Sequence, residues 1–134
     1  MLSRTFLWPQ GYTSAAMISV NLDAEFYGRI FYPGIDVSEG DIQRLGWTGM
    51  EYGLPHLLDC FREHGVKGTF FIPGRVAELY PDAVRAIADA GHELGCHGYE
   101  HEILAHFTPE EQLELLKNCL LYTSPSPRDY AASR

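Results

Sequence analysis

The sequence predicts an α/β fold in which parallel strands alternate with helices. Three short apolar segments of strand-forming residues each precede a segment whose apolar residues recur at helical spacing. Gly and Pro residues mark the ends of several of these segments. Strands that alternate with helices in this way are parallel and joined by helical crossovers, so their carboxyl ends meet at one edge. In such sheets and barrels, the catalytic and ligand-binding residues lie at that edge.

The first strand–helix unit begins with Ala15–Leu22, an apolar run with the sequence AAMISVNL. Acidic residues follow the run, which predicts a buried strand with acids at its carboxyl end. Residues 26–46 contain Tyr-Pro-Gly and Ser-Glu-Gly turn signals and predict a long mixed loop. Leucines at helical spacing predict a helix over residues 50–65, with Pro55 suited to its first turn and Gly65 to its end.

The next two units follow without a long loop. Val66–Ile72 predicts a second strand, which Pro73-Gly74 ends, and Pro81–Ala90 predicts a second helix. Glu93–Cys96 predicts a brief third strand. Thr108–Glu111 is a capping box with proline at the first helical position, and it predicts the start of a third helix. The apolar face expected on that helix consists of Leu113, Leu116 and Leu120.

The composition indicates a single domain of modest size with an acidic balance. The chain has 134 residues, of which 46% are apolar, enough to build a core. Its formal net charge of −8 argues against binding nucleic acid or an anionic membrane surface through bulk electrostatics. The charge says little about a small-molecule or glycan substrate. The composition does not determine the oligomeric state, and a homo-oligomer is compatible with this composition.

The cysteines and the N-terminal segment favour a reducing compartment. Cys60, Cys96 and Cys119 are widely spaced, odd in number and without a CxxC pair, so we expect no disulfide framework. Residues 1–14 lack the apolar core and the small-residue cleavage site of a secretory signal. No run approaches the roughly 18 apolar residues that span a bilayer. These features predict a cytoplasmic protein without a membrane partner, and they leave open where the native chain starts.

Three of the six histidines lie in residues 91–101, which have the sequence GHELGCHGYEH. A zinc-protease motif requires HExxH on a helix, so that both histidines share a face. His92 and His97 are instead five positions apart, a spacing that aligns them neither on a helix nor on a strand. We therefore reject that motif and expect no protease activity.

His97 and His101 have the spacing HxxxH, which makes them neighbours if the segment curls into a helical turn. Two imidazoles then offer two nitrogen ligands, and a zinc-like ion needs a third protein ligand and an open position. Asp23 can supply a carboxylate from the end of the first strand, and this donor set suits zinc, cobalt and similar ions. Two surface histidines and a strand-end cap at Asp23 would give the same pattern. The remaining histidines are assigned to the surface or to positions behind the ligands: His56, His64, His92 and His106.

Two stretches of the chain resemble the polysaccharide deacetylase family, the carbohydrate esterase group with the NodB-homology domain. ISVNLDAE, residues 18–25, resembles the family's first motif, an acid pair that ends the first strand. Residues 68–102, which end in GHELGCHGYEHE, resemble the stretch that leads into its second, His-rich motif. The resemblance covers residues 15–119. It is nearest to the branch of peptidoglycan-deacetylase-like proteins, cyclic imide hydrolases and cofactor-independent allantoinases.

The resemblance implies the N-terminal part of a distorted (β/α) barrel with parallel strands. It also implies a divalent metal, zinc or a similar ion such as cobalt, held by Asp23, His97 and His101. The implied reaction is hydrolysis of a non-peptide C–N amide bond, in which the metal polarises the carbonyl and activates water. In the family an aspartate takes the proton of the water, and a histidine far downstream protonates the leaving nitrogen.

The chain departs from the family pattern at two points. The aspartate expected to act as the base falls on Asn21, whose amide cannot accept a proton at neutral pH. Asn21 then orients water or substrate, or only makes a strand-end hydrogen bond. Glu25, predicted on the same face of the strand, is the other candidate for the base, or else a solvated loop acid. The downstream histidine has no counterpart here, so we expect little or no turnover from this chain alone.

Residues near the end of the second strand are candidates for the wall of a substrate pocket. These substrate-binding candidates are Phe71, Pro73 and Gly74. Phe70 and Phe71 also suit a core, and we expect one of the two to lie there.

The last residues break the pattern of strands and helices. LLYTSPSPRD, residues 120–129, resembles a translated adapter sequence that recurs at the ends of unrelated environmental reading frames. We expect a partial polysaccharide deacetylase domain over residues 1–121 and a non-native tail over residues 122–134, with a flexible linker as the alternative. Three strand–helix units form only part of a barrel, which typically has about 250 residues.

Two functions stay open at this point. The first is a metal-dependent hydrolase of non-peptide C–N bonds, acting either on N-acetylated amino sugars such as those of peptidoglycan or on a cyclic amide or imide. The lack of a secretory signal favours the small cytoplasmic substrate. The second is a catalytically impaired binding or interaction module of the same fold, which Asn21 favours.

Overall fold

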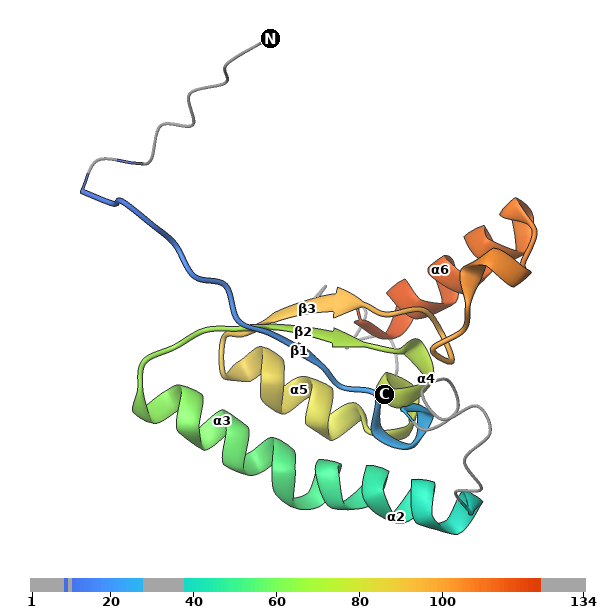
Figure 1. Ribbon diagram of the computed structural model, residues 1–134, viewed down its shortest axis with the longest axis horizontal. Helices are drawn as coiled ribbons and strands as arrows, with labels where there is room; N and C mark the ends of the chain where they lie inside the picture. Colours follow the sequence, from blue (N-terminus) through green and yellow to red (C-terminus); the bar gives the residue numbers. More distant parts are fainter. Residues whose placement is uncertain (1–8, 10, 28–37, 124–134) are drawn as a thin grey trace, which may run out of the picture.

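The structure, a computed structural model, describes residue 9, residues 11–27 and residues 38–123 (Figure 1). Its strands are β1 (Ser19–Asn21), β2 (Thr69–Ile72) and β3 (Glu93–Cys96). Its α-helices are α2 (Glu39–Thr48), α3 (Leu54–Glu63), α4 (Gly74–Leu79), α5 (Pro81–Asp89) and α6 (Pro109–Thr123). Three further helical turns are η1 (Ala24–Phe26), η2 (Gly49–Gly53) and η3 (Leu104–His106). Most of the tail predicted over residues 122–134 lies outside the described residues.

The three strands are parallel and lie in the order β1-β2-β3, as the α/β prediction requires. Asn21, Phe71 and Gly95 are in register and form a row across the sheet. Because side chains alternate along a strand, Phe70 and Ile72 point to the opposite face, where they are fully buried. That buried face is the one that α3 and α5 cover (Figure 1).

The hydrophobic core lies between the sheet and the helices. Its buried members are Phe26, Met50, Leu54, Phe61, Phe70, Ile72, Val76, Ala77, Val84 and Ile87. His92 belongs with them: its ring lies 5.3 Å from that of Phe61 and 5.2 Å from that of Phe70, measured between centroids. Its Nδ1 accepts a hydrogen bond from the backbone N–H of Gly68 at 3.1 Å. The assignment of His92 to the surface or to a position behind the ligands was wrong.

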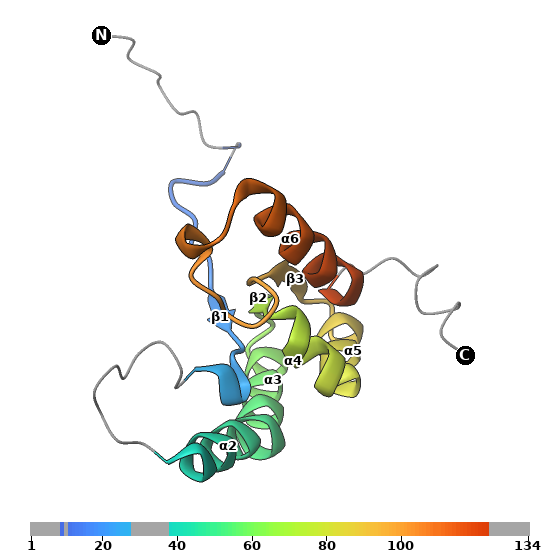
Figure 2. The ribbon, with the colours of Figure 1, turned by 90° about the vertical axis from the view of Figure 1, so that its right-hand side faces the viewer.

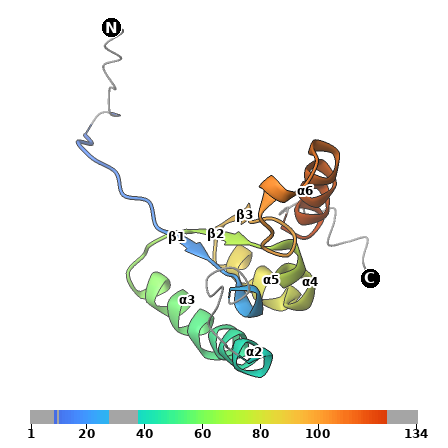
Figure 3. The same ribbon diagram turned by 45° about the vertical axis from the view of Figure 1, so that its right-hand side comes forward.

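The segment predicted as a long loop contains helix α2. Ser38 caps this helix, because its Oγ accepts a hydrogen bond from the backbone N–H of Asp41 at 3.1 Å. The Ser-Glu-Gly sequence that indicated a turn is therefore a helix start. Helix α2 continues through the π-helical turn η2 into α3 (Figure 3). The loop prediction is wrong from residue 39 onward, and residues 28–37 lie outside the described residues.

Helices α4 and α6 pack against each other, and α6 also contacts β3 (Figure 2). Pro73-Gly74 ends β2 as predicted but also begins α4, a short helix that the sequence did not predict. The capping box of α6 forms, with the Glu111 carboxylate accepting from the backbone N–H of Thr108 at 2.8 Å. The face predicted to be apolar is open to solvent: Leu113 is 54% exposed, and Leu116 and Leu120 are each 47% exposed.

Cys96, the last residue of β3, forms a disulfide with Cys119 of α6, while Cys60 is free and exposed. The prediction of no disulfide is wrong for this pair, because the packing of α6 beside β3 brings the two Cα atoms to 6.0 Å. The inference of a reducing compartment loses that support. No helix in the described part of the chain is long and apolar enough to cross a membrane.

Candidate metal centre

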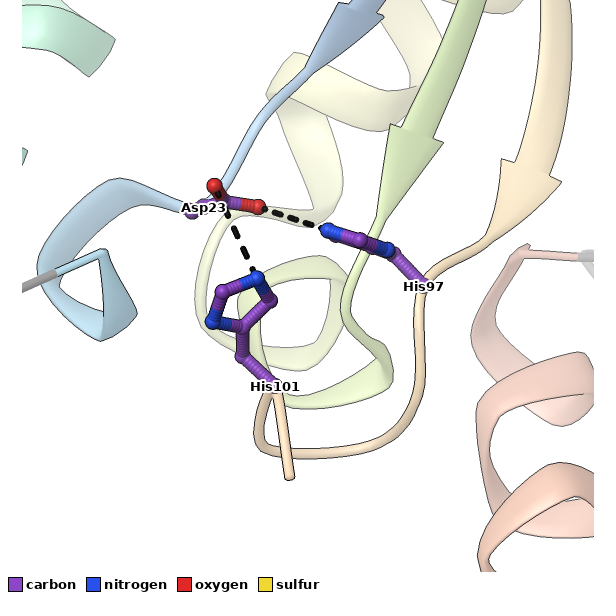
Figure 4. A group of neighbouring side chains, drawn as sticks. All are labelled: Asp23, His97 and His101. Carbon is purple, nitrogen blue, oxygen red and sulfur yellow. Dashed lines mark ion pairs between the residues drawn. The ribbon is translucent and has the colours of Figure 1, made fainter. Parts of the chain in front are cut away.

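Asp23, His97 and His101 lie together at the carboxyl edge of the sheet (Figure 4). Nε2 of His97 is 3.4 Å from Oδ1 of Asp23, and Nε2 of His101 is 3.9 Å from Oδ2. One ligand atom from each residue lies within 4.8 Å of the other two. Ligand atoms about 2 Å from a common zinc ion lie roughly 3–4 Å from one another, and both distances between Asp23 and the histidines lie in this range.

Asp23 is buried at the start of η1, with 7% of its surface exposed. Its backbone carbonyl accepts a hydrogen bond from the N–H of Phe26, but its side chain makes no capping bond. Helix α2 packs on this turn at Gly46, where a Cβ would lie 2.4 Å from the backbone nitrogen of Glu25. The strand-end cap is therefore excluded as the role of the Asp23 carboxylate, which faces the histidines instead (Figure 4).

The segment between the two histidines is a loop, not the helical turn that the spacing predicted. Gly98 and His101 both have left-handed backbone conformations, with φ of +76° and +61°. Two N–H groups at the start of α4 donate to the carbonyls of Gly98 and Tyr99 at 3.0 and 2.8 Å. The rings of His97 and His101 still become neighbours, with centroids 4.7 Å apart and planes at 61°.

The electrostatics of the cluster favour a bound cation. Burial lowers the pKa of His97 and outweighs the Asp23 and Glu102 carboxylates, which raise it, while His101 lowers it further. A lowered pKa favours the neutral form of His97, which is the form that ligates a metal. Oδ1 of Asp23 and Nε2 of His97 are buried and lack a hydrogen-bond partner among the described residues. Such atoms are costly to leave unsatisfied, and a divalent ion would satisfy both.

Comparison with known proteins decides the family. A model described as polysaccharide deacetylase matches residues 46–121. The chain belongs to the polysaccharide deacetylase family. The resemblance to that family is thereby confirmed, and the matched residues include the His97–His101 segment.

Relatives of this polysaccharide deacetylase chain carry deacetylase names. A peptidoglycan deacetylase from Helicobacter pylori is 39% identical over 105 residues, which cover 75% of this chain and 35% of the relative. A peptidoglycan-N-acetylglucosamine deacetylase from Bacillus cereus is 44% identical over 57 residues, covering 42% of this chain and 21% of the relative. The chain therefore spans about a third or less of the length of these two relatives.

A solved structure shows the same fold. A crystal structure from Mycobacterium smegmatis that is assigned to the polysaccharide deacetylases matches with a TM-score of 0.75 and 32% sequence identity. The match covers 89% of this chain and 42% of that chain. The predicted fold class, part of a distorted (β/α) barrel with parallel strands, is confirmed.

The two candidates for catalysis lie apart from each other. Asn21 is exposed on β1, on the sheet face that α3 and α5 leave open. The prediction that Glu25 shares its face is wrong, because the chain leaves the strand and turns into η1. The Glu25 carboxylate accepts a hydrogen bond from the Tyr80 hydroxyl at 3.3 Å.

The three substrate-binding candidates differ in exposure. Phe71 is partly exposed beside Asn21, and its ring covers Gly95, where a Cβ would lie 2.5 Å from Cδ1. Pro73 and Gly74 are buried. Substrate contact by any of the three stays a prediction.

A cavity of about 300 Å³ opens beside Asp23 on the side of α2. Its lining is mostly apolar and includes Tyr27, Ile42 and Met50, while Asn21 and Asp23 provide polar groups. Sequence reasoning missed this cavity because it placed a loop where α2 lies.

Proposed function

We propose that this chain is the metal-binding part of a hydrolase that removes acetyl groups from the amino sugars of a glycan such as peptidoglycan. The observation that carries the proposal is the convergence of Asp23, His97 and His101 at one edge of the sheet. The names of the relatives support a glycan substrate. The donor set supports zinc, or a similar divalent ion such as cobalt, as the cofactor.

In this proposal Asp23, His97 and His101 hold the ion, and the cavity beside Asp23 receives part of the substrate. An ion held there would supply Lewis acidity, which would polarise an amide carbonyl and lower the pKa of water. Asn21 can donate a hydrogen bond to the substrate or to water, but its amide cannot take the proton. The Glu25 carboxylate accepts a hydrogen bond from the Tyr80 hydroxyl, so we expect neither residue to be an efficient base. We therefore expect weak turnover.

The second candidate is a binding module that retains the metal centre without catalysis. Asn21 favours it, since an aspartate at that position would have supplied a proton acceptor beside the cluster. A cytoplasmic location stays a prediction, and it would favour a small cyclic amide or imide over a cell-wall glycan.

Metal binding is tested by calorimetric titration of the 134-residue chain with zinc and with cobalt. We expect one ion per chain, and loss of binding in His97→Ala and in His101→Ala. His56→Ala is the matched control, because His56 is exposed on α3 and should leave the affinity unchanged. Failure of the unmodified chain to bind either ion would overturn the metal centre.

Activity is tested on the metal-loaded chain with two substrate classes. Acetate release is measured from N-acetylglucosamine oligomers and peptidoglycan, and ring opening from hydantoin-like imides. Acetate release supports the proposed function, whereas ring opening alone moves the substrate to the imide class. A folded, metal-loaded chain that binds glycan without releasing acetate would support the binding module.

A further inference from the structure

The loop that carries the two histidines closes around the carboxylate of Glu102. The backbone N–H of Tyr99 donates to both oxygens of this carboxylate, at 3.0 and 2.9 Å. The backbone N–H of Glu100 donates to Oε2 at 2.7 Å. Successive N–H groups that converge on one anion form a nest, and hydrogen bonds to an ionised acceptor are among the stronger ones in proteins.

The fit around this carboxylate is close. Gly98 has a left-handed conformation, and a Cβ built on it would lie 2.8 Å from Oε2 of Glu102. The side chain of Glu102 therefore occupies the space that a larger residue at position 98 would need. The sequence HGYEHE thus supplies both parts of the arrangement, the permissive glycine and the anion that fills the nest.

The loop that accommodates this carboxylate ends in an unusual backbone conformation at one proposed ligand. His101 has φ of +61°, a conformation that L-residues other than glycine adopt infrequently. The start of α4 holds the loop through N–H groups that donate to the carbonyls of Gly98 and Tyr99. Glu102 holds it through the N–H groups of Tyr99 and Glu100.

We propose that Glu102 is a positioning residue that holds the backbone between His97 and His101 in the shape that lets both imidazoles face Asp23. This inference rests on the proposed metal centre. Glu102 acts through the backbone and not as a ligand, because both of its oxygens accept backbone N–H groups. The metal-ligating group found among the described residues accordingly comprises Asp23, His97 and His101 without it.

The first test needs no metal. Amide hydrogen exchange is measured by NMR on the metal-free chain and on Glu102→Gln, which keeps the size of the side chain but loses one acceptor oxygen and the charge. We expect the Tyr99 and Glu100 amides to exchange slowly in the unmodified chain and at least tenfold faster in the variant. Equal protection in the two proteins would overturn the proposal, whether or not the chain binds an ion.

The second test measures the consequence for the ion. Removing a group that orients metal ligands typically weakens metal affinity by roughly 10–100-fold, and we expect a loss of this size for zinc and cobalt in Glu102→Ala. The visible spectrum of the cobalt-loaded variant should also change, since the spectrum reports the arrangement of the ligands. Glu111→Ala is the matched control: its carboxylate also accepts a backbone N–H, but it does so at the start of α6.

The outcomes separate this inference from the proposed function. A chain that binds no ion at all overturns the metal centre, while the exchange measurement still decides the role of Glu102. A chain that binds zinc as tightly after Glu102→Ala as before overturns the positioning role and leaves the metal centre intact. Weaker binding with unchanged amide exchange would show that Glu102 acts by its charge alone, which also contradicts the proposal.

Discussion

Nε2 of His97 lies 3.4 Å from Oδ1 of Asp23, although the two residues follow the two outer strands of the sheet. Strand β2 lies between them and contributes no member of the cluster. An ion held by these atoms would therefore connect the first strand–helix unit directly to the third. Such a connection links metal binding to the stability of the whole sheet.

Zinc should stabilise the folded chain. A ligand that binds only the folded state adds about 2.7 kcal/mol when its free concentration is 100 times its dissociation constant. Urea unfolding, followed by circular dichroism with zinc and then with EDTA, measures the gain. The gain should vanish in Asp23→Ala, and an equal gain in that variant would show that zinc binds elsewhere.

Gly46→Ala should destabilise the fold and weaken metal binding together. A Cβ at this position would lie 2.4 Å from the backbone nitrogen of Glu25, so α2 or the turn that carries Asp23 must move. Overpacking of this kind costs typically about 1–3 kcal/mol, which urea unfolding detects, and zinc titration measures the lost affinity.

Gly53→Ala is the control for that substitution. A Cβ at Gly53 meets nothing within 4 Å, and alanine favours helical backbone over glycine by up to about 1 kcal/mol. This variant should be as stable as the unmodified chain or more so, with the same zinc affinity. If Gly46→Ala behaves in the same way, the packing of α2 does not hold Asp23 in place.

Asn21→Asp should increase acetate release by the metal-loaded chain. The substitution places a proton acceptor on the strand that leads to Asp23, and general-base catalysis contributes typically about 10²–10⁴-fold. The measurement is the rate of acetate release from N-acetylglucosamine oligomers. Asn118→Asp adds the same charge in α6 and should leave the rate unchanged; equal rates in all three proteins would mean that the missing base is not at position 21.

His92 should make the stability of the chain depend on pH. Burial lowers the pKa of His92 below its ordinary value, and the Lys67 charge lowers it further. The folded state therefore binds a proton less readily than the unfolded state, so the stabilisation is present above the ordinary histidine pKa of about 6.5 and is lost as the pH falls through the folded-state pKa.

Urea unfolding between pH 8 and pH 5 measures this loss. Glutamine at position 92 can still accept the hydrogen bond of the Gly68 N–H but does not titrate, so His92→Gln should show a flatter dependence on pH. His64→Gln is the control, because His64 is exposed and should leave the dependence unchanged. Identical pH profiles for His92→Gln and the unmodified chain would contradict the assignment.

Local patterns were sufficient to predict the alternating architecture and the neighbours at the site. The third strand was predicted over Glu93–Cys96, where β3 lies. The convergence of Asp23 with the two histidines followed from parallel topology, since strand ends share an edge. The route by which His101 reaches His97 did not follow, because HxxxH spacing indicates a helical turn and says nothing about a loop held by Glu102.

Other features depend on contacts between distant segments, which spacing alone does not reveal. Gly46 looked like part of a loop, although its lack of a side chain is what allows α2 to approach η1. His92 looked like a surface residue because its partners, Phe61 and Phe70, come from α3 and β2. The leucine stripe of α6 suggested burial, but α6 packs through the face that carries Cys119.

Cys96 and Cys119 close a covalent ring around residues 97–118, which contain both imidazoles and Glu102. A protease that cuts one peptide bond within this ring leaves the two pieces attached through the sulfur atoms. In a thiol-rich solution the disulfide is reduced, and the same cut leaves the two pieces without a covalent link. For a cut between His97 and His101, the ring keeps the two histidines covalently joined only where the surroundings are oxidising.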